Sequence, residues 1–305
     1  MSAAGHLPGS EAATDVPAAV PAAQGRRRGL AGYLLLLPGG AWLALFFVVP
    51  TLTLVATSLY DPAGSLQLGY QMTWHWQNYL ESISDYSPQL VRSLLYALSA
   101  TVACMLLGYP LAYAIAFKAG RFKNLMLVAV IAPFFTSFLV RTLSWQYILG
   151  DNEAVVSVLR TLHVLGPDGH LLATPFAVVT GITYNFLPFM VLPLYASLEK
   201  IDGRLVEAAA DLYSSPFTAF RTVTLPLSMP GLVAGTLLTF IPAAGDYINA
   251  ELLGNPTTRM VGNEIQDLFA AGDYPTASSL SVTLMAAIVV LVFVYVRRAG
   301  TEELV

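Results

Sequence analysis

EKIDGRLVEAAADLYSSPFTAFRTVTLP, residues 199–226, is the one sizeable polar helical segment that stands between two long apolar runs of this chain. Val206, Ala209 and Tyr213 recur at helical spacing and mark one face. Glu207 and Asp211 are four residues apart, so they share another face. The pattern predicts a polar helix that lies outside the apolar phase.

Turn and cap signals divide this 199–226 stretch into two helices. Asp202 can cap the first helix, and Ser215 followed by Pro216 is a good start for the second. Leu225-Pro226 predicts that the second helix ends there. We therefore expect two short helices with a bend between them on one face of a membrane. From spacing alone they can equally pack only on their own chain.

Composition places the whole chain in a membrane. Of its 305 residues 56% are hydrophobic and 11% charged, whereas soluble domains carry roughly 25% charged residues. Cys104 is the single cysteine, and the four histidines lack the spacing of metal ligands. We expect no disulfide and no metal site.

Six apolar stretches have the length of about 17–25 residues that crosses a bilayer, and none alternates as a barrel strand does. The sequence therefore predicts an all-α integral membrane protein with six transmembrane helices in a domain of residues 30–298. A tail of residues 1–29, rich in Ala, Pro and Gly, is expected to be disordered, and residues 299–305 form a short C-terminal tail. The expected spans are 33–59, 93–117, 125–149, 176–198, 227–248 and 279–296.

Positive charges predict the orientation of these spans, because Lys and Arg concentrate on the cytoplasmic side. With both termini inside, the inner segments hold all but four of the fifteen Lys and Arg residues; the four are Arg92, Arg141, Arg160 and Arg259. The 199–226 stretch then lies in the cytoplasm between helices 4 and 5. The outer segment of residues 245–277 is acidic, with Arg259 as its one basic residue.

Within the 199–226 stretch, Glu207-Ala208-Ala209, Asp211-Leu212 and Leu225-Pro226 resemble the cytoplasmic loop motif of type-1 permease subunits in ATP-binding-cassette importers. The resemblance implies that this loop is a coupling helix seated in a groove of an ATPase subunit. The chain departs from the family at Tyr213, where a glycine is usual, so the bend must form with the ordinary backbone torsions of non-glycine residues. The residues expected to couple to the ATPase are Glu207, Ala208, Ala209, Asp211, Tyr213, Leu225 and Pro226.

The resemblance extends over residues 30–298, and in detail the sequence is similar to the spermidine/putrescine subfamily. It is carried by RSL (92–94), PFFTSFLVRT (133–142), YNFLP (184–188), GDY (245–247), LLG (252–254) and GNEIQ (262–266). Importers of iron, sulfate, opines or amino-acid-like solutes share much of the pattern, so they stay open as alternatives for the substrate.

The partners follow from the resemblance. It implies a multi-pass subunit of the bacterial inner membrane that pairs with a second, related permease, two ATPase subunits and an extracytoplasmic solute-binding protein. No P-loop occurs in the chain, so we expect no cofactor here and ATP bound by the partner ATPase. We expect neither an enzyme nor a nucleic-acid partner. The rival interpretations are an ion-coupled secondary transporter and a membrane scaffold, and the spans show no set of midplane acids for the first.

Polar residues within or beside the spans are candidates for the substrate path. Arg141 lies about 12 Å from the outer end of its span at 1.5 Å per residue, where a charge is expensive. It can line the path, gate it by repulsion, hold an acid, snorkel outward or pair with an outer carboxylate such as Asp151.

Two further groups of candidates offer chemistry for ammonium groups or helix contacts. Asp246, Tyr247 and Glu251 supply the carboxylates and aromatic face that a polyamine needs, or Asp246 is a solvated carboxylate at a helix end. Tyr184 and Asn185 line the path or bond a neighbouring helix. Gly231 and Gly235 form a GxxxG pair that permits close helix approach.

Overall fold

The computed structural model describes residues 27–64, 69–212 and 215–299, and these residues are almost entirely helical. The chain divides into two compact units, Met1–Leu52 and Thr53–Val305. In the first unit α1 (Arg27–Leu43) and the π-helical turn η1 (Ala44–Val48) lead into α2 (Val49–Thr57), which ends in the second unit. A disordered tail was predicted for residues 1–29, and residues 1–26 lie outside the described part of the chain. Residues 27–29 are helical instead, because α1 begins at Arg27.

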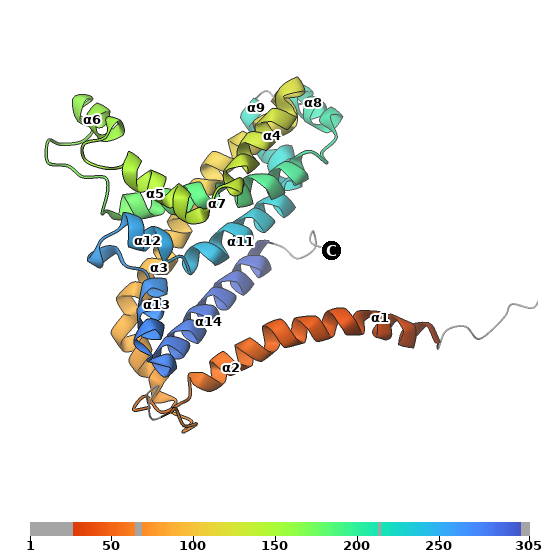
Figure 1. The fold of residues 1–305 in the computed structure, drawn as a ribbon. Helices are drawn as coiled ribbons and strands as arrows, with labels where there is room; N and C mark the ends of the chain where they lie inside the picture. The colour runs from red at the N-terminus through yellow and green to blue at the C-terminus, as the bar shows by residue number, and fades with distance from the viewer. Residues whose placement is uncertain (1–26, 65–68, 213–214, 300–305) are drawn as a thin grey trace, which may run out of the picture. The chain divides into compact units, whose positions relative to one another are not determined.

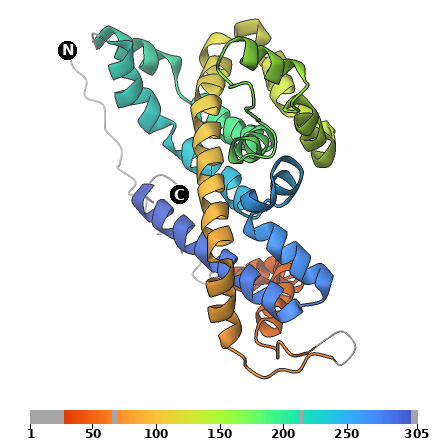
Figure 2. The ribbon, with the colours of Figure 1, turned by 90° about the vertical axis from the view of Figure 1, so that its left-hand side faces the viewer.

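Three helices form the centre of the second unit: α3 (Gln77–Tyr113), α7 (Pro175–Leu198) and α11 (Met229–Ala244). Figure 2 shows α3 as one long unbroken helix, which continues through the π-helical turn η2 (Ala114–Lys118). Small residues let these helices pack closely. A Cβ atom at Gly231 would lie 2.6 Å from the Pro193 carbonyl oxygen of α7, and one at Gly235 would lie 3.0 Å from that of Met190. The GxxxG pair therefore serves contact within this chain.

The other helices of the second unit can be followed by their labels in Figure 1. Between α3 and α7 the chain forms η3 (Gly120–Phe122), α4 (Lys123–Ile131), η4 (Ala132–Phe135), α5 (Phe138–Ile148) and α6 (Ala154–Thr161). After α11 come α12 (Ile248–Leu253), η6 (Pro256–Thr258), α13 (Val261–Ala271) and α14 (Tyr274–Ala299). Gly272 ends α13 with a φ of 85°, a left-handed conformation that glycine adopts without strain.

By length and composition, four helical stretches among the described residues can each cross a membrane: Leu35–Thr57, Gln77–Lys118, Pro175–Leu198 and Tyr274–Arg298. Two bent pairs raise the number to six if each pair is one span: Gly120–Phe135 with Phe138–Ile148, and Pro216–Leu227 with Met229–Ala244. The regions that the sequence predicted as spans are thus helical and apolar.

Two of the predicted spans are wrong as single straight helices. The 125–149 span bends by 97°, because Thr136 and Ser137 are extended, with ψ of 149° and 140°, just after Pro133. The 227–248 span starts at a bend of 68° and its helix ends at Ala244. The predicted 93–117 span is the second half of a much longer helix that begins at Gln77.

The 199–226 stretch forms two helical segments, as the sequence predicted: α8 (Gly203–Leu212), and a second built from α9 (Pro216–Ala219), the π-helical turn η5 (Phe220–Thr224) and α10 (Leu225–Leu227). The Asp202 carboxylate caps α8 by accepting from the Arg204 amide at 3.0 Å. The predicted end at Leu225-Pro226 is confirmed to within one residue, since the helix runs to Leu227 and bends by 68° before Met229. Pro226 supplies no amide donor just before this bend.

Candidate functional site

The surface of the 199–226 stretch carries large apolar side chains that its own chain leaves uncovered. Leu212 is 81% exposed, Phe217 70% and Leu205 51%. Ala208 and Asp211 are exposed as well, whereas Ala209 is buried. Pro226 is exposed and Leu225 half-buried. Of the predicted coupling residues, Tyr213 lies outside the described residues, and Glu207 is placed in α8 by its backbone alone.

Two contacts tie this stretch to the rest of the second unit. At its start, the Lys123 ammonium of α4 lies 2.6 Å from the Glu199 carboxylate, which holds the pKa of that carboxyl below its usual value. At its end, the Tyr109 hydroxyl of α3 lies 2.6 Å from the Ser228 hydroxyl. The Tyr109 ring also meets the Phe220 ring edge-on, with centroids 5.4 Å apart.

A cluster of buried polar side chains joins α5, α7 and α12. Asn185 donates from Nδ2 to Thr142 Oγ1 and to Asn249 Oδ1, both at 3.1 Å. Asn249 in turn donates from its backbone amide to Asp246 Oδ1 (3.0 Å) and from Nδ2 to Asp246 Oδ2 (2.5 Å). Asn185 Oδ1 has no hydrogen-bond partner among the described residues. Asp246 is 7% exposed, so its interpretation as a solvated carboxylate is wrong.

Arg141 precedes Thr142 in this cluster and is itself 8% exposed. Its Nε and Nη1 atoms have no hydrogen-bond partner in the part of the chain that the structure describes. Its guanidinium lies over the Phe134 ring at 5.3 Å and the Phe138 ring at 5.6 Å, on either side of the 97° bend. The proposed pairing with Asp151 is wrong, because that carboxylate is bound by Arg160 (3.5 Å) and His170 (2.8 Å).

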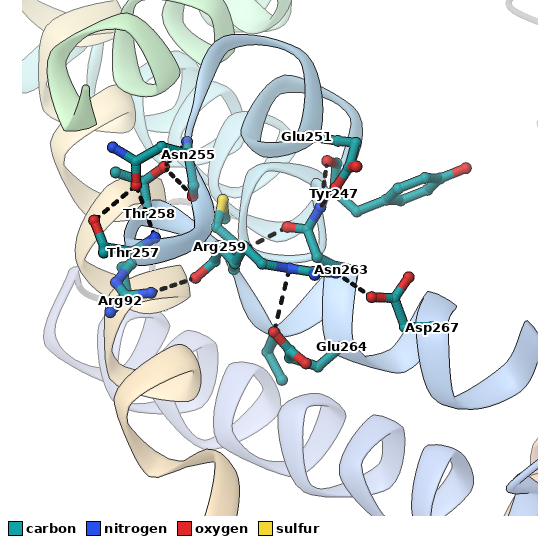
Figure 3. A network of polar contacts seen from close by, with 12 residues as sticks. Arg92, Tyr247, Glu251, Asn255, Thr257, Thr258, Arg259, Asn263, Glu264 and Asp267 are labelled. Atoms are coloured by element: carbon teal, nitrogen blue, oxygen red, sulfur yellow. Dashed lines mark hydrogen bonds and ion pairs between the residues drawn. The ribbon is translucent and has the colours of Figure 1, made fainter. Parts of the chain in front are cut away.

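The acidic segment of residues 245–277 is largely compensated from within (Figure 3). The Arg259 guanidinium pairs with Glu264 at 3.3 Å and also with Asp267, and the Arg92 side chain donates to the Arg259 carbonyl oxygen at 2.7 Å. Asn263, 2% exposed, accepts from the Met260 amide and donates to the Tyr247 carbonyl oxygen and to Glu251 Oε2, each at 3.0 Å. Most carboxylates of this segment are therefore used in contacts within the protein.

The six candidates for the substrate path fall into two groups by exposure. Glu251 is exposed, Tyr247 is 39% exposed and Tyr184 is half-buried. Figure 3 shows the Tyr247 ring pointing away from the polar network. Tyr184 packs edge-on against Trp145, with centroids 5.5 Å apart. Arg141, Asn185 and Asp246 form the buried group, out of reach of a solute in this conformation.

The residues that organise the buried polar cluster and the network of residues 245–277 were not predicted from the sequence. Asn249 and Thr142 bridge the buried cluster, and Asn263 and Arg259 organise the outer network. Asn249 stands three residues after Asp246, a spacing typical of a capping contact, and this signal points to it in the sequence. Nothing in the local sequence pairs Asn185 with Thr142, because they are far apart along the chain.

Comparison with known proteins matches the chain to one family. The family model described as the binding-protein-dependent transport system inner membrane component matches residues 105–299. The chain belongs to this family. It is therefore a multi-pass permease subunit of the inner membrane and not an enzyme, and the ATPase is a separate subunit.

Two relatives match most of the length of this permease. The spermidine/putrescine transport system permease protein PotB of Haemophilus influenzae is 36% identical over 84% of this chain and 90% of the relative. PotB of Escherichia coli K12 is 35% identical over 85% of this chain and 94% of its own. The motifs that suggested the spermidine/putrescine subfamily thus lie within a match that covers both proteins.

Solved structures agree on the fold. A chain of a bacterial ABC transporter, crystallised as the importer of the acidic polysaccharide alginate, superposes with a TM-score of 0.62. The match covers 91% of this chain and 97% of that chain at 17% identity. At this identity the likeness is one of fold.

Proposed function

We propose that this permease forms the translocation path of an ATP-driven importer for polyamines such as spermidine and putrescine. In this proposal it spans the membrane six times, with both bent helix pairs as single spans and both termini in the cytoplasm. It pairs with a second, related permease, with two ATPase subunits and with an extracytoplasmic solute-binding protein. It carries no cofactor itself, because ATP is bound by the ATPases.

The observation that carries the substrate is the 36% identity to a spermidine/putrescine permease over 84% of this chain and 90% of the relative. The alginate transporter has the same fold but takes an acidic polysaccharide, so the fold alone leaves the substrate undetermined. Iron, sulfate, opines and amino-acid-like solutes are the alternatives. A polyamine fits the exposed chemistry, since Glu251 offers a carboxylate and Tyr247 an aromatic face to an ammonium group.

The observation that carries the coupling role is the uncovered apolar surface of the 199–226 stretch. Leu205, Leu212 and Phe217 are each more than half exposed, although this polar stretch lies between two spans rather than in the lipid. Large exposed apolar groups outside a membrane mark interaction sites. The ATPase subunit is the partner proposed for this surface, with Glu207, Ala208, Ala209, Asp211, Tyr213, Leu225 and Pro226 as its contacts.

The exposed and the buried candidates for the substrate path have different roles in this proposal. Tyr184, Tyr247 and Glu251 contact the substrate, whereas Arg141, Asn185 and Asp246 position helices α5 and α12 around it. ATP-driven closure of the ATPases shifts the permease pair from inward- to outward-open. It does so only if nucleotide binds one of these states more tightly than the other.

Glu207→Arg tests the coupling role in cells that carry the whole transport system. We expect uptake of radiolabelled spermidine to be lost, with the permease still in the membrane and the ATPase no longer co-purifying. Glu81→Arg is the matched charge reversal, since Glu81 is an exposed residue of α3 remote in sequence from the stretch, and it should retain the ATPase. Undiminished uptake in Glu207→Arg would mean that the stretch does not couple.

Glu251→Gln tests the substrate role separately. We expect spermidine uptake to fall at least tenfold, because an amide replaces the charge that faces the ammonium group, while the ATPase still co-purifies. Asp267→Asn removes a neighbouring carboxylate that is 61% exposed and paired to Arg259, and it should transport nearly as wild type. If wild-type cells take up no polyamine, the substrate is wrong and the coupling role is untouched.

A further inference from the structure

The helix that leaves the 199–226 stretch bends by 68° at Ser228, between Pro216–Leu227 and Met229–Ala244. Pro226 and Pro230 flank the bend and supply no amide donors, so the helical ladder is interrupted there. Ser228 is fully buried, and its hydroxyl donates to the Leu225 carbonyl oxygen at 3.0 Å. The π-helical turn η5 stands just before the bend, and such turns are rare and frequently found at functional sites.

Beyond the bend, α11 is fixed to α7. The two glycines described above bring its backbone against Pro193, Leu194 and Met190, so closely that a Cβ atom at Gly231 would lie 2.5 Å from the Ser197 side chain. Helix α11 therefore has little freedom to slide on α7. Movement of the 199–226 stretch relative to this pair must be taken up at Ser228.

Helix α3 contacts the same bend and the π-helical turn that precedes it. The Tyr109 hydroxyl bonds that of Ser228 at 2.6 Å. Four residues further along the same face, the Tyr113 ring also meets Phe220, with centroids 6.3 Å apart and nearly perpendicular planes. Tyr109 thus contacts the bend through its hydroxyl and the π-helical turn through its ring.

We infer that Tyr109 is a positioning residue for coupled transport, because its hydrogen bond to Ser228 ties the bend to α3. With this bond, displacement of the 199–226 stretch carries the end of α3 along with it. Without it, the stretch hinges at Ser228 and the displacement is dissipated. The inference rests on the proposed coupling role of the stretch and adds the path by which a push on it reaches a second long helix.

The test compares two variants that each remove one Tyr–Ser hydroxyl pair from α3. Tyr109→Phe removes the bond at the bend, and Tyr79→Phe removes the bond between Tyr79 and Ser58 (2.5 Å) near the other end of the same helix. Both are studied as the assembled importer in proteoliposomes, by measuring spermidine transported per ATP hydrolysed. For Tyr109→Phe we expect this ratio to fall about fivefold, the effect of one net hydrogen bond. ATPase subunits should stay bound and hydrolysis should continue.

A merely structural role for Tyr109 gives a different result. Loss of stability lowers the amount of active complex, so transport and hydrolysis fall together and their ratio stays at the wild-type value. A wild-type ratio in Tyr109→Phe, or an equal fall in Tyr79→Phe, overturns the inference. Ser228→Ala should reproduce the fall, and combining it with Tyr109→Phe should add little, because both remove the same bond. Additive effects of the two substitutions also overturn it.

A second measurement keeps the inference testable if the substrate is not a polyamine. Spin labels at Lys118→Cys and Arg221→Cys, both exposed positions, report the distance between the end of α3 and η5 with and without ATP. We expect the wild type to keep one distance and Tyr109→Phe to change or broaden it on ATP binding. An unchanged distance in the variant contradicts the inference. Failure of the coupling role itself shows instead in Glu207→Arg, as retained ATPase and undiminished uptake.

Discussion

Two polar segments of this permease look alike in composition but use their side chains differently. In residues 245–277, Arg259 is shared by Glu264 and Asp267, Asn263 holds Glu251, and Asn249 takes both oxygens of Asp246. In residues 199–226, Leu205, Leu212, Phe217 and Asp211 project without such contacts among the described residues. The first segment is closed on itself, and the second leaves a surface for a partner.

The difference teaches that a count of charges does not measure how many are available to bind. Five carboxylates with one arginine suggest an acidic mouth, yet each carboxylate makes a contact within the segment, including Asp273, which accepts from the Thr276 amide at 3.2 Å. Availability is better read from exposure, which leaves Glu251 as the accessible candidate of the path. The same measure favours the 199–226 stretch as a docking surface.

The strongest test of the closed segment is Asn263→Leu. This change leaves the buried Met260 amide without an acceptor and removes one of two bonds to the Tyr247 carbonyl oxygen, which keeps the Glu251 amide as its donor at 2.9 Å. A buried group left unpaired costs about 1–3 kcal/mol, and a lost hydrogen bond costs about 1 kcal/mol. We expect a loss of about 3 kcal/mol, measured by thermal unfolding of the purified permease in detergent. Asn263→Asp retains the acceptor for the Met260 amide but sets a second carboxylate against Glu251, so it should also be destabilised. A melting temperature for Asn263→Leu equal to wild type would mean that the segment is not held by these bonds.

A smaller effect is expected for Arg259→Leu. The guanidinium is paired with two carboxylates but is 29% exposed, and Asp267 is 61% exposed, so solvent screens the pairs. We expect a loss of about 1 kcal/mol in the same unfolding measurement, reduced further in high salt because screening weakens the lost attraction. If Arg259→Leu costs as much as Asn263→Leu, the ion pairs and not the amide bonds close the segment.

Much of the fold can be predicted from the sequence because the bilayer restricts it. Apolar length located the four helical stretches that can cross a membrane and the two bent pairs. Asp202 and the Ser215-Pro216 pair located both helices of the 199–226 stretch. The bends were not predicted. Thr136 and Ser137 have extended backbones within a stretch that is apolar on both sides, and a hydropathy pattern gives no information about backbone conformation.

The candidate site was harder to predict because it depends on contacts between distant parts of the chain. Arg141 stood out as costly in a span, but its position over Phe134 and Phe138 follows from the bend that the pattern did not contain. Tyr109 gave no signal at all, because its partner Ser228 is 119 residues away. Local motifs named the residues that we propose as contacts for the ATPase, and only tertiary packing reveals which groups hold the stretch in place.

A still smaller effect is expected for the ion pair between Lys123 and Glu199 at the start of the 199–226 stretch. Lys123 lowers the pKa of Glu199, so the pair's contribution is present above the unfolded pKa of about 4.3 and is lost as the pH falls through the lowered folded value. Between pH 5 and 3 we expect the melting temperature of the wild type to drop slightly more than that of Glu199→Gln. Equal drops in the two proteins would show that the pair does not stabilise the fold.

The smallest effect on stability is expected where the stretch is most open. Leu212 is 81% exposed and Phe217 70%, so Leu212→Asp and Phe217→Asp remove almost no burial within this chain, and surface changes of this kind stay within about 0.5 kcal/mol. Their melting temperatures should match the wild type, whereas co-purification of the ATPase should be lost, because an uncompensated charge is then placed against the partner. Asn263→Leu should show the opposite pattern, an unstable permease whose surviving fraction still retains the ATPase. If instead the two aspartate variants unfold early, the apolar side chains serve this chain's own fold and the contrast between an open and a closed segment fails.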